Sequence, residues 1–285
     1  PKAPRTSHSS LVGLYITSLV LATCKLGFAV PALGPVPPWP TKVISWWYAC
    51  DNEWPAAIKM INTPARLPLV TSVQTYCGWD ISDSGKLIGE TSPACLAFFK
   101  QLTPLGVRAE IATGAGNCSI ATYRKLWADK IVSPQQLLTA ALAANVTGWN
   151  IDLEPQANNC QGGPGPVGTA ADAKLFASWL SAVREVLNPH GIRLTVDVAS
   201  WSPVLDQFAI LAPAVDRLQN METYNGASQL QWEGYFDEFV SKIPVSAAGV
   251  GLGAWNVSGA PQWWETSAAA EAKVARSIKA KVPEL

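Results

Sequence analysis

The feature that most constrains the fold is a regular alternation of strand-like and helix-like segments along the chain. Apolar runs with strand character lie at residues 42–48, 68–76, 107–114, 148–154, 192–200, 217–224 and 247–255. Helical patterns separate most of them, and the clearest covers residues 169–187, where apolar side chains recur at helical spacing. Repeated β-α units indicate a parallel sheet, because parallel strands need a crossover connection between them.

Two architectures accommodate such repeats, a closed (β/α)8 barrel and an open doubly wound sheet. An open nucleotide-binding sheet carries a glycine-rich phosphate loop after its first strand, but here the first run continues as "WWYACDNEW". The segment "GAGNCS" at 114–119 lacks the full pattern. We therefore predict a (β/α)8 barrel of the TIM type over residues 43–285. Since only seven strand-like runs are found, either the last strand is missing from this chain or the barrel closes in an unusual way.

The composition narrows the classes of function. With 21 basic and 21 acidic residues the formal charge is zero, which argues against nucleic acid or an anionic membrane as the main partner. The two histidines are His8 and His190, so a Ser-His-Asp group or a multi-histidine zinc site would have to be built on His190. We expect neither a metal nor a cofactor. The chain has 13 tryptophans, most of which are expected to pack in the core or at its edges, although carbohydrate sites also use flat aromatic faces of this kind to stack on sugars.

The N-terminal segment resembles a targeting sequence. Lys2 and Arg5 precede an apolar run at 11–24, and small residues follow at 30–32, which favours a secretory signal over residues 1–32 above a signal anchor. Residues 33–42 are proline-rich and are interpreted as a linker. We expect a protein that is secreted or lies in a secretory or lysosome-like lumen, with no membrane contact after signal removal. Three glycosylation sequons begin at Asn117, Asn145 and Asn256.

The run at 148–154 alternates strictly in polarity. Its apolar members are Trp149, Ile151 and Leu153, and its polar members are Asn150, Asp152 and Glu154. In a closed barrel the apolar side of such a strand faces the helices and the polar side faces the axis. Glu154 directly precedes Pro155 at the strand end, so it should stand at the mouth with Asp152 about 7 Å below it. Gln74, Glu110 and Asp197 also fall at plausible inward positions.

Two motifs resemble those of a known family. "GWNIDLE" at 148–154 resembles the Asp-x-x-Asp-x-Asp-x-Glu signature of glycoside hydrolase family 18, the chitinases and endo-N-acetylglucosaminidases, in the form found in chitobiase-like members. "METYNG" at 221–226 resembles the family's Met-x-Tyr-Asp motif and places Tyr224 on its tyrosine and Asn225 on its aspartate. The motifs fall on the fourth and sixth strand-like runs.

The resemblance implies a substrate-assisted retaining hydrolase, in which the 2-acetamido oxygen of the sugar attacks the anomeric carbon. It assigns Glu154 as the acid at the glycosidic oxygen, Asp152 as the acceptor for the acetamido N–H, and Tyr224 as a donor to the acetamido oxygen. The bond cleaved is a β-linkage to an N-acetylhexosamine, as in chitin or chitooligosaccharides. The expected partner is an oligosaccharide or polysaccharide that contains N-acetylglucosamine, and a monomer is expected.

The chain departs from the family pattern at several positions. Thr147 and Asn150 replace the first two aspartates of the signature, and Glu222 precedes Tyr224. The family's last-strand tryptophan has no clear counterpart. The predicted substrate-binding residues are Asn150, Asn225, Glu222, Trp47, Trp201 and Trp255, of which the tryptophans lie near predicted strand ends.

Three other readings of the carboxylates stay open. A chitinase-like lectin would keep the barrel and lose catalysis, although such proteins usually lose the acid, which is present here as Glu154. Asp152 and Glu154 would otherwise belong to a structural ion network. A metal-dependent phosphodiesterase barrel also uses carboxylates, but it normally needs a histidine.

The cysteines lie close to predicted strand ends. Cys50 and Cys77 follow the first two strand-like runs, and Cys118 and Cys160 follow the next two. Neighbouring loops on one face of a barrel favour the pairs Cys50–Cys77 and Cys118–Cys160. Cys95, near a helix start, is left as a free thiol in this prediction.

Overall fold

The fold is built on one parallel sheet. The computed structural model describes residues 44–48, 54–64, 67, 70–82, 86–114, 119–128, 132–155, 167–221, 229–251 and 267–283. The sheet has seven strands, in the order β1 (Ile44–Tyr48), β2 (Val70–Tyr76), β5 (Arg108–Thr113), β6 (Gly148–Ile151), β7 (Arg193–Val198), β8 (Arg217–Asn220) and β9 (Ala248–Val250). Each neighbouring pair is parallel.

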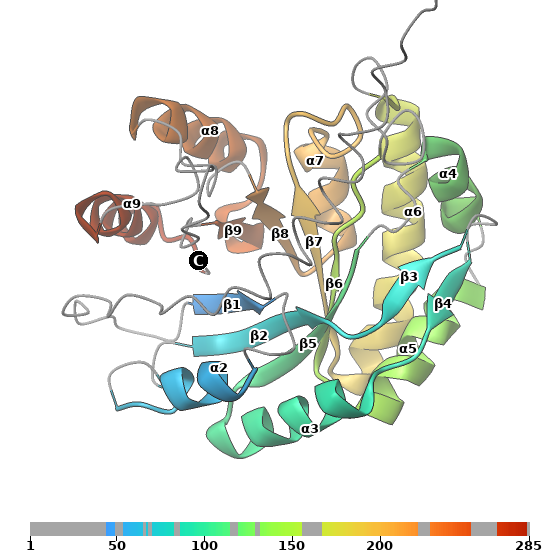
Figure 1. Ribbon diagram of the computed structural model, residues 1–285. Coiled ribbons are helices and arrows are strands. Elements are labelled where there is room, and N and C mark those ends of the chain that lie inside the picture. The colour runs from blue at the N-terminus through green and yellow to red at the C-terminus, as the bar shows by residue number, and fades with distance from the viewer. Residues whose placement is uncertain are drawn as a thin grey trace, which may run out of the picture.

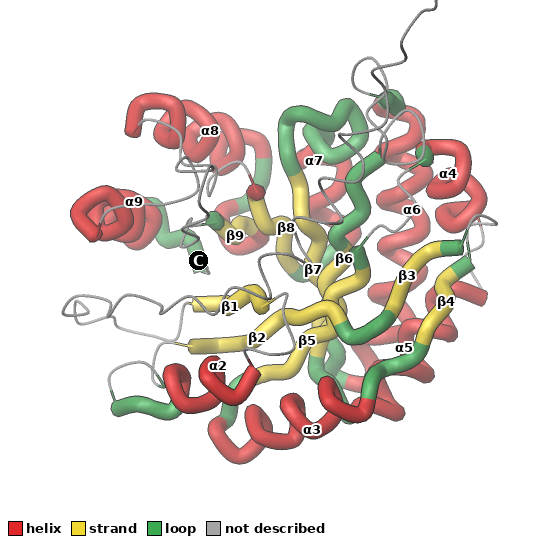
Figure 2. Tube along the Cα trace, in the orientation of Figure 1, coloured by secondary structure: helices red, strands yellow, loops and turns green. Residues whose placement is uncertain are grey.

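The predicted architecture is confirmed. The seven strands coincide with the seven predicted runs, and their order in the sheet follows their order in the chain. The sheet curls into an incompletely closed barrel of the (β/α)8 TIM type, with helices around its outer side (Figure 1, Figure 2). Within the described part of the chain, β1 and β9 stand at the two edges with no eighth strand between them.

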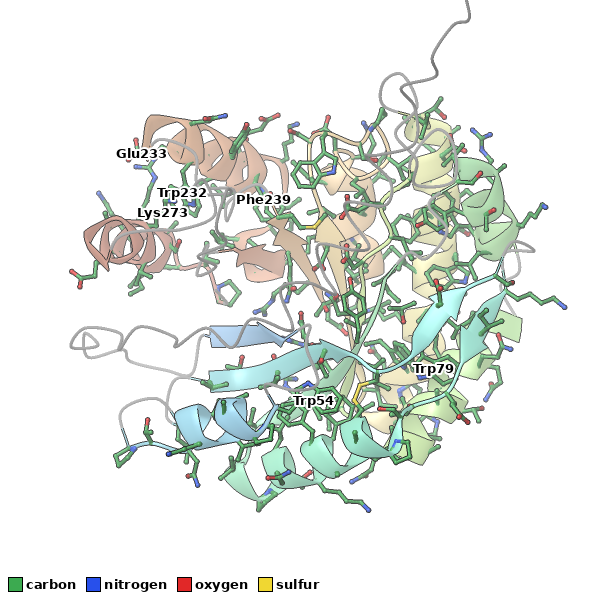
Figure 3. All side chains as sticks on the ribbon, in the orientation of Figure 1. Trp54, Trp79, Trp232, Glu233, Phe239 and Lys273 are labelled. Atoms are coloured by element: carbon green, nitrogen blue, oxygen red, sulfur yellow. A yellow bond between two sulfur atoms is a disulfide. The ribbon has the colours of Figure 1, made fainter. Side chains whose placement is uncertain are left out.

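The connecting helices form the outer layer. They are α2 (Trp54–Ile61), α3 (Pro93–Leu102), α4 (Ile120–Ala128), α5 (Val132–Ala144), α6 (Ala170–Leu187), α7 (Phe208–Leu211), α8 (Gln229–Lys242) and α9 (Ser267–Lys279). The predicted helix at 169–187 is α6, which Thr169 caps by accepting a hydrogen bond from the backbone N–H of Asp172. Lys273 of α9 lies over the Trp232 ring of α8, 5.5 Å from its centroid, which joins these two helices (Figure 3). No helix in the described ranges combines the length and apolar character that a bilayer crossing requires.

A short hairpin between β2 and α3 did not follow from the sequence pattern. Strands β3 (Trp79–Ile81) and β4 (Leu87–Gly89) pair antiparallel. Gly89 has a φ of +115°, and a Cβ atom there would lie 2.1 Å from the carbonyl oxygen of Gly78. Both the left-handed backbone and the close approach therefore require glycine. Three-residue strands are too short to produce a readable alternation.

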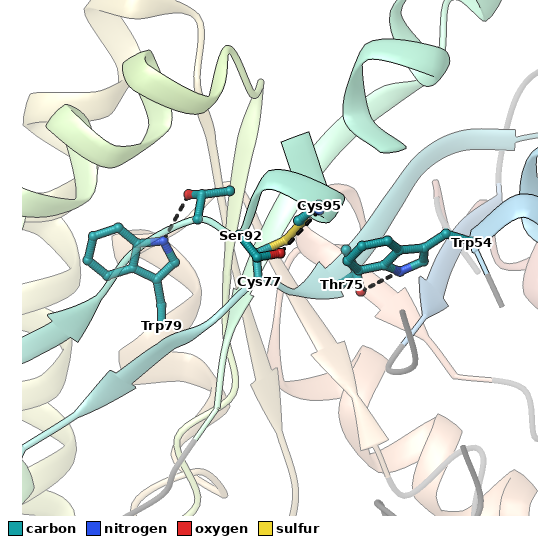
Figure 4. Close-up of a disulfide and its surroundings, with 7 residues drawn as sticks. Trp54, Thr75, Cys77, Trp79, Ser92 and Cys95 are labelled. Carbon is teal, nitrogen blue, oxygen red and sulfur yellow. Dashed lines mark hydrogen bonds between the residues drawn. A yellow bond between two sulfur atoms is a disulfide. The ribbon is translucent and has the colours of Figure 1, made fainter. Parts of the chain in front are cut away.

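The hairpin brings Cys77 to Cys95, and the two form a disulfide (Figure 4). The predicted Cys50–Cys77 pair and the predicted free Cys95 are therefore wrong. The physical reason is that the hairpin returns the chain to the end of β2, where the Ser92 backbone N–H donates to the Cys77 carbonyl at 3.2 Å. Ser92 also caps α3, whose first turn then carries Cys95 to a Cα–Cα distance of 5.8 Å from Cys77. Cys50, Cys118 and Cys160 lie outside the described residues.

A buried ion pair occupies the lower part of the barrel interior. Arg193 of β7 and Glu110 of β5 approach to 2.7 Å, with side chains only 8% and 0% exposed. Gln74 donates to Glu110 at 2.9 Å, and Arg193 donates to Ser72 at 3.2 Å. Gly148 lies between Glu110 and Arg193 in register, and a Cβ there would lie 2.6 Å from Glu110 Cγ. The inward placement predicted for Gln74 and Glu110 is thus confirmed.

Replacing Arg193 tests the importance of this pair for the fold. Arg193→Met should lower the free energy of unfolding by about 3–5 kcal/mol, because it leaves the Glu110 carboxylate buried without its counter-ion. Urea unfolding followed by tryptophan fluorescence measures the loss. The matched control is Asp237→Asn, which breaks the exposed Asp237–Arg276 pair and should cost no more than about 1 kcal/mol. Equal losses in the two variants would contradict the interpretation.

Candidate active site

The carboxylates singled out in the sequence lie just beyond the end of β6. The Trp149 indole N–H donates to the Leu137 carbonyl of α5 at 2.9 Å, so the apolar side of the strand faces the helices. The Asp152 backbone N–H donates to the Thr113 carbonyl at 3.0 Å and extends the pairing with β5 by one residue. Catalytic groups of barrel enzymes stand at this end of the strands.

Asp152 is held by a tyrosine from another strand. The hydroxyl of Tyr76, the last residue of β2, donates to Asp152 Oδ2 at 2.5 Å. The ring crosses the end of β5 at Gly114, where a Cβ atom would lie 2.5 Å from Tyr76 Cε1. The other carboxylate oxygen, Asp152 Oδ1, is buried and has no hydrogen-bond partner among the described atoms. Asp152 therefore has one oxygen engaged by the protein and one available to a ligand.

Asn150 lies deeper in the barrel and binds a third carboxyl group. Its side-chain N–H groups donate to Thr195 Oγ1 at 3.1 Å and to Asp197 Oδ1 at 2.9 Å. Asn150 pairs in register with Thr195; two residues further along, Asp152 is therefore expected to face Asp197. The inward position predicted for Asp197 is confirmed, and its side chain is buried.

Glu154 lies nearer the mouth of the barrel and contacts Trp201, one of the tryptophans predicted to bind the substrate. The indole N–H of Trp201 donates a hydrogen bond to the Glu154 side chain. Trp201 follows β7 and is 41% exposed. Its indole N–H therefore binds the carboxyl group of Glu154 while part of the indole ring faces solvent. The structure thus brings Trp201 and Glu154 together.

The clustered carboxyl groups change each other's protonation. Burial, followed by the charge of Asp152, raises the pKa of Glu154 to about 7, and the Trp201 hydrogen bond partly opposes this. Burial raises the pKa of Asp152, against which the Tyr76 hydrogen bond acts. Burial and the charge of Asp152 raise the pKa of Asp197 well above its usual value. Near neutral pH the site therefore retains protons, and Glu154 is close to its midpoint.

Sequence reasoning missed Tyr76. Counting in twos from the inward Gln74 reaches Tyr76, so a signal for its direction was present. What the pattern lacked was any indication that a β2 side chain passes over Gly114 to reach β6.

Several predicted site residues are not placed. Tyr224, Asn225, Glu222 and Trp255 lie outside the described residues, and Trp47 is in β1 but its side chain is outside the described part. Their roles stay predictions. Across the ranges that are described, no group of three or more His, Cys, Asp or Glu side chains is arranged to hold a metal ion.

Comparison with known proteins gives structural matches only. No protein-family model and no curated protein sequence matches the chain. A chitinase from Chromobacterium violaceum matches with a TM-score of 0.57 and 17% identity, over 74% of this chain and 68% of that one. The Bacillus cereus spore cortex-lytic enzyme SleL matches with 0.57 and 16%, over 75% and 51%. A GH18 chitinase from Pseudoalteromonas aurantia matches with 0.54 and 14%, over 73% and 79%.

These matches define the class of fold. The chain has a chitinase-like barrel, although it spans only about half of the SleL chain. More particularly, the barrel is of the type found in glycoside hydrolase family 18, as the motif resemblance predicted. At these identities the likeness concerns the fold.

The raised pKa of Glu154 predicts a pH-dependent effect on stability. A carboxyl group whose pKa is higher in the folded state stabilises that state below its unfolded pKa of about 4.3. This contribution is lost as the pH rises through the folded value of about 7. Glu154→Gln should therefore gain stability relative to the unmodified protein between about pH 4.5 and 7, with a slope of at most about 1.4 kcal/mol per pH unit.

Urea unfolding across this pH range measures the difference. The matched acid-to-amide control is Glu185→Gln on the exposed side of α6, which reports the removal of a surface charge. If the stability of Glu154→Gln runs parallel to that of the unmodified protein at every pH, the assigned protonation of Glu154 is wrong.

Proposed function

We propose that this protein is a glycoside hydrolase that cleaves β-linked N-acetylhexosamine in chitin-like oligosaccharides or polysaccharides by a substrate-assisted retaining mechanism. The observation that carries the proposal is the pair Asp152 and Glu154 beyond the end of β6 in a chitinase-like barrel. Glu154 has a pKa of about 7, and Asp152 keeps one buried oxygen without a hydrogen-bond partner among the described atoms.

In the first step Glu154 acts as the acid. It donates its proton to the glycosidic oxygen while the acetamido carbonyl oxygen of the sugar forms a bond to the anomeric carbon. The anomeric bond to the leaving sugar breaks, and a cyclic oxazolinium ion remains. Asp152 Oδ1 accepts a hydrogen bond from the acetamido N–H and stabilises the positive charge that develops there.

In the second step Glu154 acts as the base. Its carboxylate takes a proton from a water molecule, whose oxygen attacks the anomeric carbon and opens the oxazolinium ring. The acetamido group is restored and Glu154 regains its proton. Because the anomeric carbon is attacked twice from opposite sides, the product keeps the β configuration. This use of Glu154 requires that its pKa lie near the working pH.

Trp201 supports this cycle in two ways. Its indole N–H binds Glu154 and thereby orients the acid, and its exposed surface offers a flat face to a sugar ring. In the same proposal Tyr224 donates to the acetamido oxygen, and Asn150, Asn225, Glu222, Trp47 and Trp255 contribute to the substrate site, as the sequence predicts.

The setting of the protein belongs to the same proposal. A disulfide between Cys77 and Cys95 fits an oxidising compartment, which supports a secreted or lumenal location. The proposed partner is an oligosaccharide or polysaccharide that contains N-acetylglucosamine, and the proposed acting form is a monomer. The competing function is a carbohydrate-binding protein without catalysis.

A single substitution separates hydrolysis from binding. Glu154→Gln should lower kcat on chitooligosaccharides by about 10²- to 10⁴-fold, because the amide cannot donate the proton. Binding of chitotetraose by calorimetry should stay within a few fold, and Glu185→Gln should behave as the unmodified protein in both assays. Equal binding with no cleavage by any of the proteins would support the carbohydrate-binding alternative.

The pH dependence follows from the same carboxyl group. Because Glu154 must be protonated in the first step, kcat/KM should fall above about pH 7, approaching tenfold per pH unit. A fluorogenic chitobioside assayed between pH 4 and 9 measures this limb. An activity that stays constant from pH 7 to 9 would show that Glu154 is not the acid.

A further inference from the structure

The hydrogen bond to Asp152 comes from an unexpected direction. In the signature that this chain resembles, a carboxyl group stands two residues before the equivalent of Asp152, whereas this chain has Asn150 there. The Asn150 amide donates to Thr195 and Asp197. The side-chain hydrogen bond recorded for Asp152 comes from Tyr76 on β2.

Building on the proposed function, we propose that Tyr76 is the positioning residue that holds Asp152 ready for the reaction. Its hydroxyl favours the carboxylate form of Asp152, with Oδ2 turned toward β2 and Oδ1 left for the acetamido N–H of the substrate. A phenol O–H that donates to a carboxylate makes a short, charge-assisted hydrogen bond, which favours the ionised form.

The surrounding structure keeps Tyr76 in this position. Gly114 leaves the space through which the ring passes, since a Cβ atom there would lie 2.5 Å from Tyr76 Cε1. The next residue, Cys77, is joined to Cys95 of α3, which ties down the end of β2. Tyr76 is therefore preorganised, and little ordering remains to be done when substrate binds.

Several ionisable groups share the surroundings of Asp152. Glu154 follows it along the same segment, and Asp197 faces it from β7, with Glu110 of β5 further down. Tyr123 of α4 also feels the charge of Asp152 and Glu154, but its buried hydroxyl has no hydrogen-bond partner in the described part of the structure. Burial raises the pKa of Asp152 and so disfavours its ionised form, and the Tyr76 hydrogen bond acts in the opposite direction.

The first test is Tyr76→Phe, which removes only the hydroxyl. We expect kcat to fall about 10- to 100-fold with KM changed less than about twofold, since Asp152 is held less well in the transition state. The acid limb of the kcat profile should move up by about one pH unit, because Asp152 then ionises less readily. Tyr123→Phe is the matched control: it removes a buried hydroxyl near the same carboxylates and should leave the acid limb in place.

A second variant reaches the same interaction without changing Tyr76. Gly114→Ala should push the ring aside and reproduce both the loss of kcat and the shifted acid limb. Thermal unfolding of each variant confirms that the protein is folded at the assay temperature. If Tyr76→Phe has the same kcat and the same pH profile as the unmodified protein, the proposal is overturned. It is also overturned if the acid limb of the kcat profile stays in place in both Tyr76→Phe and Gly114→Ala.

A direct titration makes the result independent of catalysis. With carboxyl-¹³C aspartate, the Asp152 resonance is identified by its absence in Asp152→Asn and followed between pH 3 and 9. Its midpoint should be about one pH unit higher in Tyr76→Phe than in the unmodified protein, and unchanged in Tyr123→Phe. If the unmodified protein hydrolyses no chitooligosaccharide, the proposed function fails, whereas equal Asp152 midpoints in the unmodified protein and Tyr76→Phe overturn the role of Tyr76.

Discussion

The inside of the barrel is polar from its lower part to its mouth, and each group there needs a partner because the surrounding strands remove it from water. In the lowest part of the barrel Glu110 and Arg193 form a buried ion pair. Gln74 donates a further hydrogen bond to Glu110, and Arg193 donates one to Ser72. Gly148 makes room for this pair on β6. The strand that carries the candidate active site is therefore shaped at its start by an ion pair between its neighbours.

Nearer the mouth of the barrel, the carboxyl groups have hydrogen-bond partners but no ion pair like that of Glu110 is described, and this difference affects their protonation. Asp197 is bound by Asn150 and Asp152 by Tyr76, and both of these partners are uncharged. Asp197 is buried and Asp152 and Glu154 are partly buried, and three carboxyl groups this close together disfavour full ionisation. The pKa of Glu154 is raised as a result, which makes the group nearest the mouth a suitable proton donor.

The sequence predicted much of the fold because alternation and helical spacing are local properties. The seven strands and α6 appear where the patterns place them. The alternation of 148–154 also predicted that Trp149 faces the helices and that Asp152 and Glu154 face inward. The β3–β4 hairpin and the Cys77–Cys95 disulfide were missed, since the hairpin strands are too short for a readable period and the pairing depends on how the hairpin returns the chain.

The sequence by itself determined which side chains enter the barrel, because successive residues of a strand point to opposite faces. Only the tertiary structure decided how these side chains pair. That Tyr76 binds Asp152 depends on the order of β2, β5 and β6 in the sheet and on the space left at Gly114. Such contacts join residues 76 positions apart in the chain, and no local period carries information about them.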